Sequence, residues 1–319
     1  MFRKSCSAQA LLGLYAICLS MAAMPMQANA QVVEQVIKDW QKKAKRTDGV
    51  IYQLEGKIIF AKGHMSRTFS DLLPAEVPVP SEDYTDQTKT NWHIHLDKNW
   101  IRKEIWKPMF YTGKLVFCPR YEVGCFDGKD CVSYTPRKEN TSAAYTPSAK
   151  QPDLTFRLNR SAAFNFLVED YPILFAHGIV PYEPITLENL RASIKPSVLG
   201  YVGKEKKDGR HYHVFKTPAR GKMAQLVNEI WVDPERESAI AFMKQWNRGN
   251  LSSILSIEYM ERKGVWLPKE WKTLSYDEGG QLGRHHHQTV KEAVLNPPLK
   301  QADFRIEIKP GMIVSDARK

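Results

Sequence analysis

The second half of the chain consists almost entirely of short segments that alternate apolar and polar residues between turn signals. From Val198 onward, such segments are interrupted at Asp208-Gly209, Asp233-Pro234, Lys263-Gly264 and Glu278-Gly279-Gly280. This alternation is typical of antiparallel strands, and Asp-Gly pairs are typical of tight turns. An apolar sheet face must curve or be covered. The pattern predicts a mainly β, α+β fold in which helices cover the concave side of a curved antiparallel sheet.

The first half begins with a predicted helix and continues in strands. Apolar residues at helical spacing between Gln31 and Arg46 predict the helix, with basic residues at its end where they suit the helix dipole. Alternation then predicts strands from Val50, and a hairpin that turns at Asp127-Gly128. In the strand from Asn91, the side chains of Trp92, Ile94 and Leu96 share one face, and those of His93, His95 and Asp97 share the other.

Loops, further helices and a last strand are also predicted. Prolines and polar residues predict long loops near residues 73–90 and 137–153. Residues 158–169 and the segment after Thr186 are interpreted as helical. ADFRIEIKPG, residues 302–311, is interpreted as the final strand, with the side chains of Phe304, Ile306 and Ile308 on one face.

Residues 1–30 have the order of a secretory signal peptide. Arg3 and Lys4 precede an apolar run, and Ala28-Asn29-Ala30 supplies a small-x-small cleavage site after Ala30. An uncleaved N-terminal anchor is the alternative. The interpretation predicts a periplasmic or secreted protein with one domain, residues 31–319. Cleavage removes two basic residues and no acid, so the formal net charge falls from +11 to +9. A basic chain suits an anionic membrane surface, whereas export argues against nucleic acid as a partner.

Three cysteines remain after cleavage, Cys118, Cys125 and Cys131. In an oxidising compartment a local disulfide is expected, with one thiol left over. The sequence does not choose the pair. Cys118 with Cys125 would clamp two strands across a turn, and Cys125 with Cys131 would close the loop between them. A zinc site of three thiolates lacks a nearby histidine to complete it.

Several motifs in both halves are similar to one family. They are WVDPE at Trp231–Glu235, GVWLPKEW at Gly264–Trp271, NPPLKQADFRIEIKPGMIVSD at Asn296–Asp316 and the hairpin CFDGKDCVSYTP. In this order they resemble the lipoprotein-localisation carrier superfamily, which contains the outer-membrane lipoprotein carriers and sorting-like exported bacterial proteins. The resemblance implies an incomplete antiparallel β-barrel with helices plugging its mouth. It also implies noncovalent binding of a lipid, an acyl chain or a lipidated protein, without catalysis.

Aromatic and histidine side chains are the candidate site residues. Four tryptophans, Trp231, Trp246, Trp266 and Trp271, are candidates for lining a ligand cavity, although such residues are more often core. His285 and His287 are metal-ligand candidates, because the spacing i, i+2 places both imidazoles on one face of a strand.

Two further pairs, His93 with His95 and His211 with His213, could meet the first pair if their strands were neighbours. The alternative is that these histidines belong to a solvated outer face, since no carboxylate has the spacing of a zinc protease.

The sequence contains no nucleophile elbow, phosphate-binding loop or dinucleotide fingerprint. Together with the resemblance, this predicts an exported, non-enzymatic protein of the cell envelope without a cofactor. Carrying or sensing a hydrophobic or lipidated ligand, in a hydrophobic cavity between the sheet and its N-terminal and plugging helices, is what the resemblance implies. Two alternatives stay open: a metal-dependent envelope hydrolase that uses the paired histidines, and a structural or interaction module of the cell envelope with a filled core.

Overall fold

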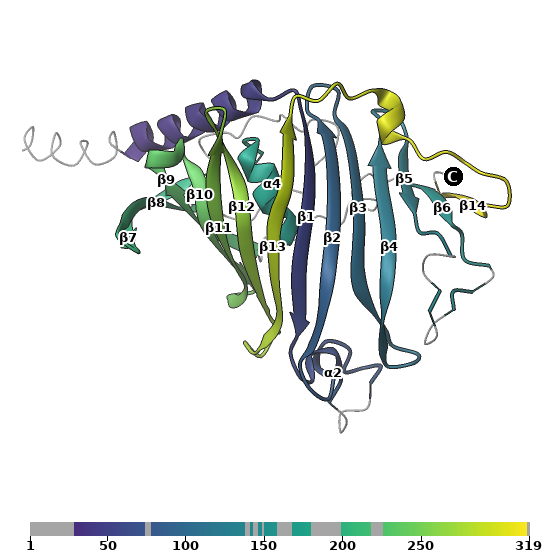
Figure 1. The fold of residues 1–319 in the computed structure, drawn as a ribbon. Helices are drawn as coiled ribbons and strands as arrows, with labels where there is room; N and C mark the ends of the chain where they lie inside the picture. The colour runs from purple at the N-terminus through teal and green to yellow at the C-terminus, as the bar shows by residue number, and fades with distance from the viewer. Residues whose placement is uncertain are drawn as a thin grey trace, which may run out of the picture.

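A single sheet of fourteen strands dominates the described part of the chain (Figure 1). The computed structural model describes residues 29–73, 78–137, 141–142, 146–148, 150–157, 168–179, 199–217 and 226–317. The strand order is β14-β6-β5-β4-β3-β2-β1-β13-β12-β11-β10-β9-β8-β7, so β14 and β7 are the edges and no pairing between described strands closes the sheet. The mainly β fold class, with an open sheet and few helices, is confirmed.

The strands are long in the centre of the sheet and short toward the β14 edge. They are β1 (Gly49–Phe60), β2 (Tyr84–His95), β3 (Trp100–Tyr111), β4 (Val116–Phe126), β5 (Cys131–Tyr134), β6 (Leu154–Arg157), β7 (Gly200–Lys207), β8 (Arg210–Thr217), β9 (Leu226–Asp233), β10 (Ala239–Asn247), β11 (Asn250–Arg262), β12 (Val265–Tyr276), β13 (Leu282–Leu295) and β14 (Val314–Ala317). The helical elements are an N-terminal helix at 29–46, α2 (His64–Thr68), η1 (Val168–Asp170), α4 (Tyr171–Ala176), η4 (Pro234–Arg236) and η5 (Gln301–Phe304).

The two halves of the chain meet at the pairing of β1 with β13. This antiparallel pair runs from Val50 opposite Leu295 to Phe60 opposite Arg284, with a bulge at Gln53. The first half of the chain therefore builds one wing of the sheet and the second half builds the other. The last strand, β14, crosses back and pairs in parallel with β6 at the far edge. One continuous sheet thus depends on contacts between the two ends of the chain.

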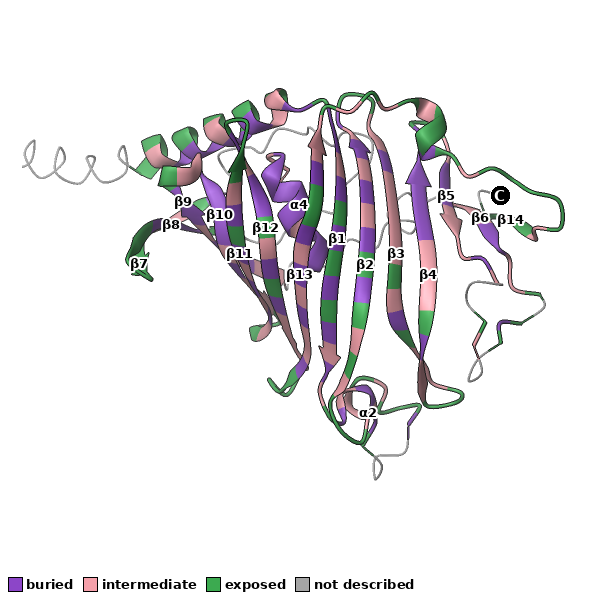
Figure 2. Cartoon of the chain, viewed as in Figure 1, coloured by how far each residue is buried: buried purple, intermediate pink, exposed green. Residues whose placement is uncertain are grey.

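One face of the sheet is covered, and we call it the inner face. There α4 lies against β12 and β10, and its residues Ile173 and Phe175 join the main hydrophobic cluster (Figure 1). Buried and exposed residues alternate along β1 and β2, as expected where one face is packed (Figure 2). The side chains of Tyr52, Trp92 and Trp271 are almost completely buried in this cluster.

The predicted N-terminal helix is confirmed at residues 29–46. Its apolar stripe, which includes Val36 and Trp40, is buried in the main cluster. At its end, Trp40 Nε1 donates to the Ser238 carbonyl at 2.6 Å, and Arg46 Nη1 donates to the Gly264 carbonyl at 2.9 Å. The helix therefore lies across the turns at one end of β9–β12 (Figure 1).

The predicted turns are confirmed. Asp208-Gly209 joins β7 to β8 and Lys263-Gly264 joins β11 to β12, and all four residues have positive φ. Two consecutive positive φ values are what a tight hairpin turn with the twist of its strands requires. Asp127 Oδ1 accepts from the backbone N–H groups of Lys129 and Asp130, which fixes the turn between β4 and β5.

Two predictions about strand boundaries are wrong. The loop predicted near 73–90 ends early, because β2 begins at Tyr84 and pairs with β1 over its whole length. The threonines that read as loop residues, Thr88 and Thr90, are buried on the inner face. The final strand predicted at 302–311 is absent: η5 occupies Gln301–Phe304, and the short strand β14 comes later. Phe304 is buried but Ile308 is 54% exposed, so they do not share a packed face.

The predicted disulfide is also wrong. Cys118, Cys125 and Cys131 are buried and form no disulfide. Cys118 and Cys125 belong to the same strand, β4, where they are about 23 Å apart along the extended chain. Cys125 is opposite Val132 and Cys131 is opposite Phe126, so side-chain alternation directs the two thiols to opposite faces of the β4–β5 hairpin. Neither geometry suits a disulfide, which needs Cα atoms within about 7 Å and converging side chains.

Some predictions fall outside the described residues. These are most of the signal peptide (1–28), most of the helix at 158–169 and the helix after Thr186. The described residues within 137–153 form no helix or strand, as predicted for a loop there. In the part of the chain that the structure describes, no helix has both the length and the apolar character needed to cross a membrane.

Candidate functional site

A cavity of about 480 Å³ opens on the inner face, in the wing formed by β1 to β6. The packing of α4 and the N-terminal helix fills the inner face of the other wing. The cavity lies beside that packing, over β1, β3 and β4, between α2 and η1. Its lining combines apolar and charged side chains. The apolar ones include Ile58, Phe60, Met65, Phe69, Ile105, Met109, Phe110 and Val123, and the charged ones are Lys103, Lys107, Arg120, Glu122, Arg157, Glu169 and Arg284.

The apolar end of the cavity is built at α2. Met65 of α2 packs with Ile58 and Phe60 of β1 in a hydrophobic cluster separate from the main one. Phe110 and Phe69 have ring centroids 6.3 Å apart, next to this cluster. These rings pack on neighbouring side chains but also border the open volume of the cavity. This end of the cavity can therefore accept apolar atoms from a ligand.

Another part of the cavity wall is built from buried acids on η1 that pair with bases on the sheet. Glu169 Oε2 is 3.2 Å from Arg284 Nη2, and Asp170 Oδ2 is 2.6 Å from Lys103 Nζ. Burial opposes ionisation of Glu169, but Arg284 and His286 outweigh it and hold its pKa below the ordinary value. The backbone of η1 is fixed as well, since the Glu169 carbonyl accepts from Trp271 Nε1 at 2.8 Å. These acids therefore neutralise cations of the sheet and have a clear structural role.

Like His64 of α2, His286 lines the cavity. Its Nε2 is 3.0 Å from Thr88 Oγ1 on the inner face, and its Nδ1 is buried with no hydrogen-bond partner among the described residues. Burial lowers its pKa to about 4, so the imidazole is neutral at physiological pH. It adds a polar but uncharged group to the cavity.

Two bases in the cavity lack an acidic partner. Lys107 makes no hydrogen bond or ion pair with any described residue, and burial lowers its pKa. Arg157 Nε donates to Ser133 Oγ at 3.2 Å, and no carboxylate in the described ranges contacts its guanidinium. Arg120 pairs with Glu122 at 2.6 Å, yet its Nε is buried and without a described partner. The cavity thus carries positive charge that the described protein does not neutralise.

Sequence reasoning missed these residues because lysines share the inner face of β3 with apolar residues. Its basic residues Lys103 and Lys107 point to the inner face, where Lys103 Nζ lies 5.1 Å from the ring centroid of the buried Trp92. Its tryptophan, Trp106, points outward, is 38% exposed and stacks on Tyr121 at 4.5 Å between ring centroids. Ile101 and Ile105 face inward as the rule for apolar residues predicts, but alternation places Lys103 and Lys107 on that same face, where charged residues are not expected.

The four predicted tryptophans are not brought together, and none of them lines this cavity. Trp271 is buried in the main cluster. Trp231 packs with Tyr212 and Phe242, with centroids about 6 Å apart, and the ring of Trp266 lies 5.1 Å from the Arg236 guanidinium. Trp246 is partly buried near the end of β10. A ligand-binding role for these residues remains a prediction.

The predicted metal ligands, His285 and His287, lie on the outer face of β13, to either side of the inward His286. His287 Nε2 is 3.5 Å from Glu270 Oε2, and the described residues contain no cluster of three potential metal ligands. The suggested meeting of histidine pairs does not occur, because His93 is opposite Ile51 and His287 is opposite Lys57 on β1. Those positions are roughly 20 Å apart along the strand.

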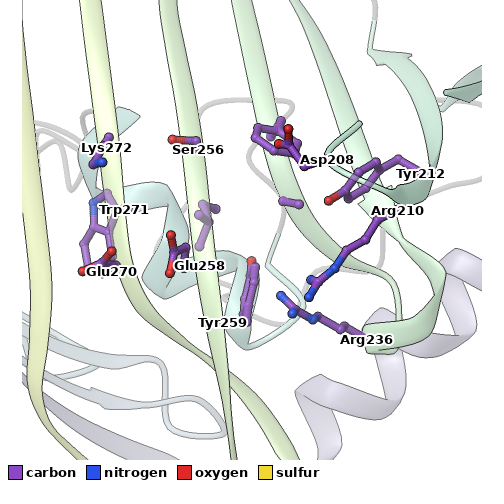
Figure 3. Close-up of a pocket in the computed structure, with 13 residues that line it drawn as sticks. Asp208, Arg210, Tyr212, Arg236, Ser256, Glu258, Tyr259, Glu270, Trp271 and Lys272 are labelled. Atoms are coloured by element: carbon purple, nitrogen blue, oxygen red, sulfur yellow. The ribbon is translucent and has the colours of Figure 1, made fainter. Parts of the chain in front are cut away.

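A second hollow, of about 470 Å³, lies between β8 and β12. Glu258, Glu270 and Lys272 line it, and they alternate with the core residues Ile257 and Trp271, so the hollow opens on the outer face (Figure 3). Its acids and bases are equal in number. The full charged lining is Asp208, Arg210, Arg236, Glu258, Glu270 and Lys272.

Figure 3 shows Arg210 and Arg236 of the second hollow reaching toward Tyr259. Both guanidinium groups also lie 3.6–3.8 Å from the carboxylate of the buried Asp233. Because its charges are balanced, this hollow is a weaker candidate for a ligand site than the inner-face cavity.

Comparison with known proteins gives a likeness to solved structures only. No protein-family model matches the chain, and no curated protein matches it. The chain is similar to a DUF1329 family protein from Desulfovibrio piger, with 13% identity and a TM-score of 0.48 over 88% of this chain and 97% of that one. It is similar to a domain named for outer membrane lipoprotein sorting from Vibrio parahaemolyticus, with 11% identity and a TM-score of 0.46 over 85% and 97%.

A third structure, of a LolA superfamily protein from Nitrosomonas europaea, has 10% identity and a TM-score of 0.44 over 86% of this chain and 97% of that one. At these values the likenesses say nothing about a ligand, so the site is interpreted from its own geometry.

Proposed function

We propose that this protein is a non-catalytic binding protein of the cell envelope, which holds the apolar chain of an amphiphilic ligand in the inner-face cavity. The observation that carries the proposal is the apolar end of that cavity, where Ile58, Phe60 and Met65 border open volume. Transfer of an alkyl chain from water to such a surface contributes about 0.8 kcal/mol per methylene. The export signal predicted at residues 1–30 supports a place in the envelope.

Catalysis is not part of the proposal. The acids of the cavity, Glu122 and Glu169, are engaged with Arg120 and Arg284, and His286 is neutral and bonded to Thr88. A general base or nucleophile needs a group that is poised to exchange a proton at the site. The lining instead offers fixed charges and apolar rings, which is a set of groups that suits binding.

Calorimetric titration of residues 31–319 with octanol and decanol tests the proposal. Because these alcohols carry no charge, they measure how the alkyl chain of a ligand contributes to affinity, separately from a charged headgroup. Two additional methylenes are expected to tighten binding by about 15-fold. No binding of either alcohol, or equal affinities for the two, would refute a cavity for apolar chains.

Ile105 and Trp106 provide a matched pair of variants. Ile105 is partly buried and lines the cavity, whereas Trp106 is the next residue on the same strand and faces outward. Ile105→Gln is expected to weaken decanol binding about 5-fold, because about 1 kcal/mol of apolar contact is lost. Trp106→Gln is expected to leave the affinity for decanol within twofold of the wild-type value. Circular dichroism of both variants checks that the sheet is intact.

A further inference from the structure

Two positive side chains face each other on the inner face, in the middle of the cavity. Lys107 of β3 and Arg120 of β4 are directly opposite residues of an antiparallel pair, and both line the cavity. Their Cβ atoms are therefore roughly 5 Å apart. Like charges at this spacing destabilise a sheet. Two facing positive side chains are tolerated where a neighbouring group or a ligand supplies negative charge.

The protein supplies only part of that charge. Glu122 lies beside this pair, and its carboxylate is engaged with Arg120 Nη2 at 2.6 Å. Glu169 and Asp170 also act on Lys107, but they pair with Arg284 and Lys103. Lys107 has no hydrogen-bonding or ionic partner in the described chain, and Arg120 Nε is a buried donor without a described acceptor. Arg157 adds a further cation in the same cavity, bonded only to the Ser133 hydroxyl among described residues.

The cations continue directly into the apolar end. Met109 and Phe110 follow Lys107 on β3, and Phe110 packs toward Phe69 and the cluster at α2. A ligand with its head at Lys107 and Arg120 would place its chain along this apolar surface. The cavity therefore has a charged part that adjoins an apolar part, as the charged head and apolar chain of an amphiphile require.

We infer that the ligand is an anionic amphiphile, whose carboxylate or phosphate head binds between Lys107 and Arg120, in a cavity that Arg157 also lines. The inference rests on the proposed function, which concerns the apolar chain of the ligand. It adds that the headgroup of the ligand is negatively charged. Two unpaired donors and a net positive lining recognise both kinds of anion. A bound anion would also remove the repulsion between Lys107 and Arg120, and so would stabilise the protein as well as the complex.

The test compares four ligands by calorimetry at pH 7.5 and low salt: decanol, decanoate, decyl phosphate and inorganic phosphate. Wild-type protein is expected to bind decanoate and decyl phosphate at least tenfold more tightly than decanol. Free phosphate is expected to bind at least 100-fold more weakly than decyl phosphate. The preference for the anions should shrink as salt is added, because screening weakens attraction between charges.

Lys107→Met removes the charge and keeps most of the apolar stem. It is expected to reduce the preference for decanoate over decanol to less than threefold. Lys89→Met is the control, since Lys89 is an exposed lysine on the outer face of β2. That variant is expected to keep the full preference.

The outcomes separate the two proposals. Equal affinities of wild-type protein for decanoate and decanol would overturn the inference while leaving the cavity for apolar chains in place. A preference that survives in Lys107→Met would also overturn it. If free phosphate binds as tightly as decyl phosphate, the inference of an amphiphilic ligand is overturned and the cavity is a site for small anions. No binding of decanol or of decanoate would refute the proposed function itself.

Discussion

At the scale of single residues, the clearest energetic cost is a lysine buried under the N-terminal helix. Lys43 is only 2% exposed. Burial lowers its pKa to about 8, although Glu237 and Asp39 act in the opposite direction. Below pH 8 the ammonium is charged in both the folded and the unfolded protein, so the folded protein bears the full cost of burying it. Between pH 8 and the ordinary lysine value, only the unfolded chain keeps the proton, and stability rises with pH.

We therefore expect Lys43→Met to raise the free energy of unfolding at pH 7, by up to about 3 kcal/mol. The gain should diminish as pH rises from 8 and should be nearly absent at about pH 10.5. Urea denaturation at pH 7, 9 and 10.5 measures it. Lys45→Met is the control, because Lys45 is exposed on the same helix. A loss of stability at pH 7 would mean that attraction to Glu237 and Asp39 exceeds the cost of burial.

At the scale of elements, α4 is a short helix that tertiary contacts hold in place. With the six residues Tyr171–Ala176 it is far too short to be stable alone. His177, directly after it, is buried with Nδ1 3.0 Å from Thr47 Oγ1 and Nε2 3.0 Å from the Tyr52 hydroxyl. The chain then turns at Gly178 against the N-terminal helix. The closure of the inner face beside the cavity depends on this contact.

Gly178 is expected to tolerate no side chain. Its φ is +72°, and a Cβ would lie 2.2 Å from the Trp40 carbonyl oxygen, which is backbone and cannot rotate away. Gly178→Ala should cost about 3 kcal/mol or more, from the left-handed backbone and the steric clash together. Gly249 has φ of +82° with nothing near its Cβ position, so Gly249→Ala should cost only about 1–2 kcal/mol. If the two variants lose similar amounts of unfolding free energy, α4 and the N-terminal helix can move apart freely.

At the scale of the whole molecule, the C-terminal segment holds the far edge of the sheet. Phe304 is 1% exposed and packs on Trp100, and Arg305 Nε donates to Asp127 Oδ2 at 2.6 Å. Further along, the Ile313 carbonyl accepts from the Asp153 backbone N–H at 2.9 Å, and β14 then covers the edge of β6. An uncovered strand edge is a template for pairing with another molecule.

Two truncations separate these roles. Removal of residues 312–319 should uncover β6 and promote self-association, measured by light scattering, with a small change in Tm. Removal of residues 300–319 should do the same and also lower Tm by several degrees, because the buried Phe304 and the Arg305–Asp127 ion pair are lost. Monodisperse protein after either truncation would show that β6 needs no cover.

Much of the fold could be predicted from local pattern, and the errors have local causes. Turn chemistry at Asp208-Gly209 and Lys263-Gly264 requires positive φ, so those hairpins follow from the residues themselves. The start of β2 was missed because threonine and charged residues at Tyr84–Thr90 resemble a loop, while pairing with β1 makes them a strand. The disulfide was wrongly expected because nearness in sequence does not show which face a side chain occupies.

The candidate site could not be predicted in the same way. The sequence drew attention to His285 and His287, whereas register places His286 in the cavity. Lys107 and Arg120 become neighbours only through the pairing of β3 with β4. No periodicity reveals that β3 turns its lysines inward and Trp106 outward, because alternation fixes two faces without saying which one is covered.

The sequence by itself determined most of the strands, the tight turns, the N-terminal helix and the mainly β fold class, because those follow from interactions between residues close along the chain. The tertiary structure alone decided the pairing of β1 with β13, the covered face and the identity of the cavity residues. These depend on contacts between distant segments, which lower the free energy only when the whole sheet is assembled.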